Sequence, residues 1–177
     1  MRPTYYSIHS TYGSLVQTYW DGDCFYPYGW DGFKVDAHLG RWFYVAGHEP
    51  KFKQRCSCVT VEYTRKKRNR IGVEEHCQLE EFQQGINVTG LFLSEDWRKG
   101  VMEPPPKRWG KNGVYRVEFQ DAFHNDNYTQ ACMGPNYIVA DQKPDHSIVI
   151  AANMSRLYIL ARSPYVNDKT IDPRRDF

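Results

Sequence analysis

The chain has 177 residues and a formal net charge of +2, which fits a single domain and does not suggest a protein dedicated to binding nucleic acid. Hydrophobic residues make up 41% and charged residues 25%, so the chain can bury a core and is not expected to be disordered. No run of about 18 apolar residues occurs, which excludes a transmembrane helix. Aromatic residues reach 15%, and aromatics favour strands and line sites for apolar ligands.

The first 39 residues show no regular hydrophobic pattern. They combine many aromatic residues with glycine and proline, as in the segment Tyr26-Pro27-Tyr28-Gly29-Trp30. A flexible linker would not carry so many aromatic residues. We therefore predict an irregular, aromatic-rich N-terminal arm over residues 1–39 that packs on the rest of the protein.

After residue 40, apolar and polar residues alternate with a period of two, which predicts strands. In one such segment Val59, Val61 and Tyr63 share a face, and in another Tyr115, Val117 and Phe119 do so. Longer loops are expected over 49–56, 95–112 and 122–135. The eight predicted strands cover 41–48, 57–65, 70–79, 85–94, 113–121, 136–142, 146–152 and 156–162.

Eight short alternating strands in meander order predict an all-β fold, an eight-stranded up-and-down antiparallel barrel over residues 40–164. A barrel of this size can enclose one small ligand. An immunoglobulin-like sandwich is the alternative, but the chain lacks the expected Cys…Trp…Cys spacing. No long helix is expected anywhere, and residues 165–177 form a mostly polar C-terminal tail.

Two segments resemble the signature motifs of the lipocalin family. Gly40-Arg41-Trp42-Phe43-Tyr44-Val45-Ala46 resembles the GxW motif that opens the first strand. Leu157-Tyr158-Ile159-Leu160-Ala161-Arg162-Ser163-Pro164 resembles the arginine motif that closes the last strand, especially in apolipoprotein D-like and bacterial outer-membrane lipocalins. The segment Gly134–Val139 resembles the Y-x-V strand of the family. The resemblance covers roughly residues 22–164.

The resemblance implies specific structural features. Trp42 and Arg162 would meet at the closed end of the barrel as a cation–π stack worth about 1–2 kcal/mol. The segment Asp23–Pro27 and the surroundings of Cys58, Cys77 and Cys132 resemble secreted fungal lipocalins in particular. Lipocalins usually carry a long helix after the last strand, and fungal members a cysteine beyond it. This chain ends about a dozen residues after Pro164, so no long C-terminal helix is expected and one thiol stays unpaired.

The family register also implies which residues face the interior of the barrel and bind a ligand. Such an apolar lining with several hydroxyl groups suits a flat or long lipophile that carries one or two polar groups. The alternative is that these side chains simply fill the barrel as core. The inward candidates are Tyr44, Val61, Tyr63, Val88, Phe92, Tyr115, Val117, Phe119, Tyr137, Val139 and Tyr158.

Five cysteines leave the compartment and the pairing open. No CxxC pair occurs, so a zinc ribbon or a thioredoxin-like motif is not favoured. Across the turn 66–69, Cys58 lies nearly opposite Cys77 and Cys56 is two residues away on the same face, so one of these two is expected to pair with Cys77. Cys24 with Cys132 is then the remaining pair.

The scattered cysteines and three N-glycosylation sequons, at Asn87, Asn127 and Asn153, favour a secreted glycoprotein with disulfides. No signal peptide is visible in this chain, and a cytosolic protein with reduced thiols is the alternative.

Titratable residues offer few sharper clues. His48 and His124 are expected near the rim of the open end, together with loops 49–56, 80–84, 122–135 and 153–155. Glu75, His76 and Asp141 lie on predicted strands and can face inward or outward; a buried one could act as a general acid or base. The basic run 65–70 resembles a nuclear-localisation or phosphate-binding patch, although its place on a tight turn favours a solvated hairpin tip. No motif predicts a metal or a cofactor.

The sequence thus predicts a secreted carrier or sequestering protein for a small hydrophobic molecule. An alternative is a lipocalin-like enzyme, a cyclase or isomerase that folds a lipophilic, polyene-like substrate in the cavity. A third possibility is a glycosylated surface protein with a filled barrel. No catalytic residue and no nucleic-acid partner is indicated, and the sequence does not define an oligomeric state.

Overall fold

The computed structural model describes residues 4–9, 15–47, 56–84, 89–106, 109, 112–119 and 132–165. The N-terminal region contains β1 (Thr4–His9), β2 (Leu15–Trp20), β3 (Phe25–Pro27) and the short helix α1 (Val35–His38). Strands β4 (Gly40–Gly47), β5 (Cys56–Arg65), β6 (Ile71–Gln84) and β7 (Thr89–Glu103) follow. The chain continues with β8 (Val114–Phe119), β9 (Tyr137–Gln142), β10 (His146–Ile150), a 3₁₀ turn η4 (Ala152–Met154) and β11 (Leu157–Ala161).

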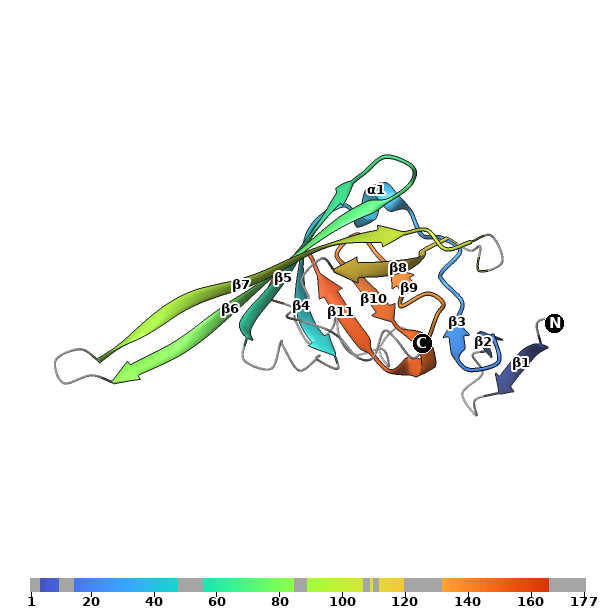
Figure 1. Ribbon diagram of the computed structural model, residues 1–177, viewed down its shortest axis with the longest axis horizontal. Coiled ribbons are helices and arrows are strands. Elements are labelled where there is room, and N and C mark those ends of the chain that lie inside the picture. The colour runs from blue at the N-terminus through green and yellow to red at the C-terminus, as the bar shows by residue number, and fades with distance from the viewer. Residues whose placement is uncertain are drawn as a thin grey trace.

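Strands β4 to β11 form one closed antiparallel barrel (Figure 1). Each strand pairs with the next along the chain, and β11 pairs with β4 to close the ring. The predicted all-β fold and the up-and-down barrel are therefore confirmed. Within the described part of the chain, no helix is both long and apolar enough to cross a membrane.

Alternation along the strands sorts side chains between the core and the outside. In β5, Val59, Val61 and Tyr63 are buried, whereas Thr60 and Glu62 between them are partly exposed. Successive side chains of a strand point to opposite faces, so this period-two pattern places one complete set inside the barrel.

Strands β6 and β7 are longer than the sequence pattern predicted. They pair from Ile71↔Met102 to Gln84↔Thr89, so the predicted loop at 80–84 is wrong, as is the first part of the loop predicted at 95–112. Figure 1 shows the two strands continuing together beyond the barrel. Segment 80–84 contains only one apolar residue, Phe82, so the period-two pattern did not reveal this part of the strand.

The N-terminal region is more regular than the expected irregular arm. Strands β1, β2 and β3 form a separate antiparallel sheet, with Tyr19 opposite Tyr26 and Trp20 opposite Phe25. The β-branched and aromatic residues of these segments are strong strand formers, and the neighbouring glycines and prolines obscured that signal. The rings of Tyr19 and Tyr26 each pack edge-on against Trp109, at centroid distances of 4.6 and 4.5 Å.

Helix α1 closes one end of the barrel. Val35 and Leu39 pack against the barrel core, and His38 is completely buried. The Arg162 guanidinium lies 3.6 Å from the centroid of the Trp42 ring, as the lipocalin motifs predicted. It also donates hydrogen bonds of 2.7–2.8 Å to the backbone carbonyls of Ala37, Leu39 and Arg41, so one side chain ties the last strand to the helix and to β4.

Two disulfides confirm the expected pairing. Cys24 bonds to Cys132 and Cys56 bonds to Cys77, which leaves Cys58 as a free thiol. Cys56 rather than Cys58 pairs because a register shift between them places Cys58 opposite Gln78.

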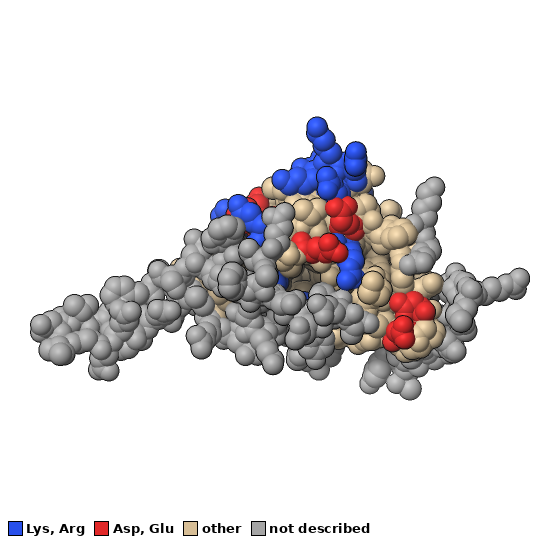
Figure 2. All heavy atoms as spheres, viewed as in Figure 1, with Lys and Arg blue, Asp and Glu red and all other residues tan. Residues whose placement is uncertain are grey.

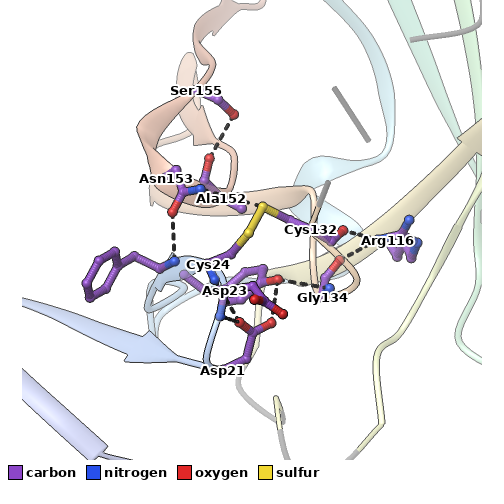
Figure 3. The surroundings of a disulfide bond; sticks show 11 residues. Asp21, Asp23, Cys24, Arg116, Cys132, Gly134, Ala152, Asn153 and Ser155 are labelled. Atoms are coloured by element: carbon purple, nitrogen blue, oxygen red, sulfur yellow. Dashed lines mark hydrogen bonds between the residues drawn. A yellow bond between two sulfur atoms is a disulfide. The ribbon is translucent and has the colours of Figure 1, made fainter. Parts of the chain in front are cut away.

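The Cys24–Cys132 disulfide fixes the N-terminal region to the barrel (Figure 3). Beside it, the backbone N–H groups of Asp23 and Cys24 donate to the Asp21 carboxylate, and that of Phe25 donates to Asn153 Oδ1. On the barrel side of the disulfide, Arg116 donates to the carbonyls of Cys132 and Gly134. The hydrogen bond from Phe25 to Asn153 and that from the Gly134 N–H to the Tyr26 hydroxyl therefore join the two regions together with the disulfide.

Candidate ligand-binding site

The interior of the barrel holds one continuous hydrophobic cluster. Nine of the eleven residues predicted to face inward belong to this cluster or pack against it. Val88 lies outside the described residues, and so does the side chain of Phe92 in β7. The nine are Tyr44, Val61, Tyr63, Tyr115, Val117, Phe119, Tyr137, Val139 and Tyr158.

The cluster is sealed at the end that α1 covers. Trp42, Val61, Ile71, Met102 and Val139 are each 0% exposed. Close packing of this kind leaves no room for a ligand, so these residues form the floor of the barrel.

Farther from α1, the interior is less completely filled. Tyr44 follows Trp42 by two positions on β4 and is partly exposed, although it packs against the cluster. On β8, Tyr115 is buried, whereas Val117 and Phe119 keep accessible surface while packing against the same cluster. Tyr44, Val117 and Phe119 are therefore less completely buried than the floor residues, whereas Tyr158, which lies beside Tyr44, is 8% exposed.

A neutral hydrogen-bonded group occupies the floor. Gln142 Nε2 lies 3.2 Å from His38 Nδ1, and His38 Nε2 lies 2.8 Å from the Tyr137 hydroxyl. Because the Gln142 amide donates to Nδ1, we assign the ring proton to Nε2, which donates to Tyr137. The Tyr137 hydroxyl in turn donates to the Tyr63 oxygen at 2.7 Å. Burial, with a further contribution from the nearby Arg162 charge, lowers the pKa of His38 to about 3, so the imidazole is neutral at physiological pH.

A charged group lies next to the sealed floor. Glu75 on β6 and Arg98 on β7 are opposite one another in the strand ladder, and Arg98 Nε donates to Glu75 Oε2 at 2.6 Å. The Tyr44 hydroxyl donates to Glu75 Oε1 at 2.8 Å. Glu75 is 5% exposed and Arg98 3%, so this ion pair is buried among aromatic side chains.

Glycine makes room for this arrangement. Arg98 lies 3.7 Å above the Phe119 ring, and Gly100 is paired with Phe119 on the adjacent strand. A Cβ at position 100 would lie 2.6 Å from the Glu118 carbonyl oxygen and 2.9 Å from the Phe119 ring. A larger residue there would displace Phe119 and with it the face on which Arg98 stacks.

The inner tyrosines are un-ionised hydroxyl groups. Burial raises the pKa of Tyr44, Tyr63 and Tyr137 well above its ordinary value, and the Glu75 charge adds to the shift at Tyr44. Burial also raises the pKa of Tyr158 to about 12. These groups therefore act as hydrogen-bonding partners rather than as bases.

Sequence reasoning identified only part of these polar groups. Of the three strand residues whose orientation it left open, Glu75 is buried, whereas His76 and Asp141 are partly exposed and pair with Glu74 and Lys143. Arg98, His38 and Gln142 were missed. Arg98 fell in a predicted loop and His38 in the predicted arm, and Gln142 ends a predicted strand without any distinguishing signal. His48, His124 and the rim loops 49–55 and 122–131 lie outside the described residues.

The basic run 65–70 is a hairpin tip, as its sequence favoured. Lys66, Lys67 and Arg68 are exposed, and Figure 2 shows Lys and Arg side chains gathered at this end of the molecule. Arg65 and Arg70 form ion pairs with Asp36 and Glu103. No group of three metal-ligating side chains occurs among the residues that the structure describes.

The family follows from comparison with known proteins. Residues 33–174 match the model of the lipocalin-like domain. Since this match spans most of the chain, the protein belongs to the lipocalin-like domain family. No curated protein matches the chain, and nothing in the comparisons bears on the fungal or apolipoprotein D-like subgroups.

Comparison with solved structures gives matches of low sequence identity. Insecticyanin from the tobacco hornworm Manduca sexta is 16% identical with a TM-score of 0.52, covering 85% of this chain and 77% of that one. Lobster apocrustacyanin A1 is 13% identical with a TM-score of 0.49, covering 78% and 67%. Japanin from Rhipicephalus appendiculatus, solved bound to cholesterol, is 14% identical with a TM-score of 0.46, covering 76% and 83%. At 16% identity, the likeness to insecticyanin concerns the fold alone.

Proposed function

We propose that the barrel binds a small hydrophobic molecule in its interior and acts as a carrier or sequestering protein. The observation that carries this proposal is the exposure of inner residues. The floor around Trp42 is sealed, whereas Tyr44, Val117 and Phe119 keep accessible surface although they pack against the inner cluster. Covering such aromatic and aliphatic surface with a lipophile contributes about 25 cal/mol per Å².

Ligand contact is assigned by position within the barrel. Tyr44, Val117 and Phe119 are the proposed direct contacts, with Tyr158 beside Tyr44 at a ring distance of 5.2 Å. The other described inward residues support the ligand from below as the floor. Val88 stays a prediction outside the described residues, and Phe92 pairs with Glu81 in the part of the β6–β7 ribbon that continues beyond the barrel (Figure 1). Membership of the lipocalin-like family supports this assignment.

The enzyme alternative gains no support from the described interior. A general acid or base needs a pKa near the working pH and access to a substrate. His38 is completely buried, lies between Tyr137 and Gln142, and has a pKa near 3. Its hydrogen bonds give it a structural role. The buried Glu75 carboxylate is held by Arg98 and Tyr44.

We also infer that the protein works outside the cytosol. Two disulfides are present, and stable disulfides are typical of oxidising compartments. Secretion from eukaryotic cells followed by mass spectrometry, with and without removal of N-glycans, tests this setting and the use of the three sequons together. Protein recovered only from the cytosol with reduced thiols would contradict it.

Mass spectrometry without reductant tests ligand binding directly. Native spectra of the purified protein are expected to show a bound small molecule that denaturing spectra lose. If the protein is purified empty, titration with 1-dodecylpyrene, followed by pyrene fluorescence, is expected to saturate at one molecule per chain.

A matched pair of variants on β8 locates the site. Val117→Phe fills the interior beside Phe119 and is expected to weaken binding of 1-dodecylpyrene at least tenfold. Glu118→Phe places the same ring on the exposed neighbouring position and is expected to leave binding unchanged. An equal effect of the two variants, or no saturable binding at all, would overturn the proposal.

A further inference from the structure

We propose that Glu75, Arg98 and Tyr44 form the polar end of the ligand site and select a lipophile that ends in an uncharged hydroxyl group over one that ends in a carboxylate. This inference rests on the proposed function, since it concerns the chemistry of the same interior. It starts from the presence of two opposite charges among the aromatic and aliphatic side chains of the described interior.

The geometry places this group next to the proposed ligand contacts. Tyr44 and Phe119 keep accessible surface, and each contacts the ion pair directly. The Tyr44 hydroxyl is 2.8 Å from Glu75, and the Phe119 ring is 3.7 Å from the Arg98 guanidinium. A lipophile that covers Tyr44 and Phe119 therefore ends against the one charged group in the described part of the interior.

The charges of the group define the chemistry that it can accept. Glu75 is a hydrogen-bond acceptor, whereas Arg98 and Tyr44 are donors. The charges of Glu75 and Arg98 cancel, so the group provides both donors and an acceptor but no net charge. A hydroxyl group both donates and accepts, and it matches this arrangement.

A carboxylate does not match. It only accepts hydrogen bonds, and it would add a second negative charge beside Glu75 in a medium of low dielectric constant, where like charges repel strongly. The other described histidine and arginines near the interior are neutral or have partners of their own. His38 is neutral, and Arg162 is committed to Trp42 and to three carbonyls at the floor. Arg156 forms a side-chain hydrogen bond with Tyr158.

Stability alone does not account for the pair. A buried ion pair usually stabilises a fold no better than apolar side chains of the same volume, because desolvating both charges offsets their attraction. One position away on the same two strands, Glu74 and Lys99 form a partly exposed ion pair at 3.1 Å. The same ladder thus offers a solvent-facing pair as a direct control for the buried one.

Three pyrene probes with one common tail test the inference on the unmodified protein at pH 8. They are 12-(1-pyrenyl)dodecanol, 12-(1-pyrenyl)dodecanoic acid and 1-dodecylpyrene, which ends in a methyl group. The alcohol is expected to bind at least tenfold more tightly than the acid and more tightly than the hydrocarbon. If all three bind equally, or if the acid binds best, the selectivity inference is overturned while the proposed function stands. If none binds, the proposed function itself fails.

Two variants test which residues carry the selectivity. Glu75→Gln leaves the Arg98 charge uncompensated and is expected to reverse the preference, so that the acid binds at least tenfold more tightly than the alcohol. Glu74→Gln makes the same change of net charge on the outer face and is expected to keep the order found with the unmodified protein. An unchanged order in Glu75→Gln, or a reversal in Glu74→Gln, contradicts the inference. If Glu75→Gln does not fold, the comparison of the three probes still decides the question.

Discussion

Two buried polar groups inside the same barrel differ in charge and in what surrounds them. At the floor, His38, Tyr137, Tyr63 and Gln142 hydrogen-bond one another as neutral groups below a sealed core. Next to it, Glu75 and Arg98 form an ion pair beside aromatic rings that keep accessible surface. The contrast fits our proposal that the neutral group at the floor stabilises the fold, whereas the charged group takes part in ligand recognition.

The largest expected effect on stability comes from removing one of the two charges of the Glu75–Arg98 ion pair. Glu75→Gln removes one charge and leaves Arg98 buried without its counter-ion, which is expected to destabilise the fold by about 3–5 kcal/mol. Replacing both residues, as Glu75→Leu with Arg98→Met, is expected to restore most of that stability because no isolated charge remains. Urea denaturation of the three proteins measures the difference. A double variant as unstable as the single one would show that the pair itself stabilises the barrel.

At the floor, His38 is expected to make the stability of the protein depend on pH. The pKa of His38 is about 3 in the folded protein and about 6.5 in the unfolded chain. Between these values only the unfolded state binds the proton, so this group lowers stability as the pH falls from 6.5 toward 3, by about 3 kcal/mol at pH 4. Above pH 6.5 its contribution is constant.

The variant His38→Gln isolates this contribution. It is expected to show a smaller loss of stability between pH 6.5 and pH 4 than the unmodified protein, whatever its absolute stability at neutral pH. Urea midpoints across that range provide the measurement. Parallel curves for the two proteins would mean that His38 does not titrate on unfolding as described.

A smaller effect is expected at the outer side of the floor. Arg162→Lys keeps the charge but loses the planar group that stacks on Trp42 and reaches three carbonyls, and it is expected to reduce stability by about 2 kcal/mol. Arg41→Lys, at an exposed position paired with Glu62, is the matched control and is expected to change stability by less than about 0.5 kcal/mol. Thermal denaturation of both variants compares them. Equal effects would contradict the special role of the stack.

Much of the fold was predictable because strand alternation and two short motifs are visible in the sequence. Strands such as β5 and β8 alternate apolar and polar residues, and the motifs around Trp42 and Arg162 mark the first and last strands of the barrel. The pairing of Cys77 followed from the hairpin register, although the choice of Cys56 over Cys58 depends on a local register shift that the sequence does not reveal.

The polar interior was much harder to predict. Alternation identifies an inward position by its apolar residue, so Arg98, an inward-facing charge flanked by Trp97 and Lys99, looked like part of a loop. Glu75 lay on a predicted strand, but only its pairing with Arg98 across the ladder shows that it faces inward. Buried charges are visible in a sequence only once the partner and the register are known.

The smallest expected effects come from replacing one tyrosine by phenylalanine in each of the two groups, the charged group and the neutral group at the floor. Tyr44→Phe removes a hydrogen bond to the charged Glu75 and is expected to destabilise the protein by about 2 kcal/mol, whereas Tyr63→Phe removes a neutral bond from Tyr137 and is expected to destabilise it by about 1 kcal/mol. Only Tyr44→Phe is expected to reduce the preference for 12-(1-pyrenyl)dodecanol over 1-dodecylpyrene, because Tyr44 hydrogen-bonds to Glu75 of the ion pair, whereas Tyr63 accepts from Tyr137 at the floor. Urea denaturation and the pyrene titration measure the two effects separately. If Tyr63→Phe changes the preference as much as Tyr44→Phe, the two groups do not divide stability and recognition between them.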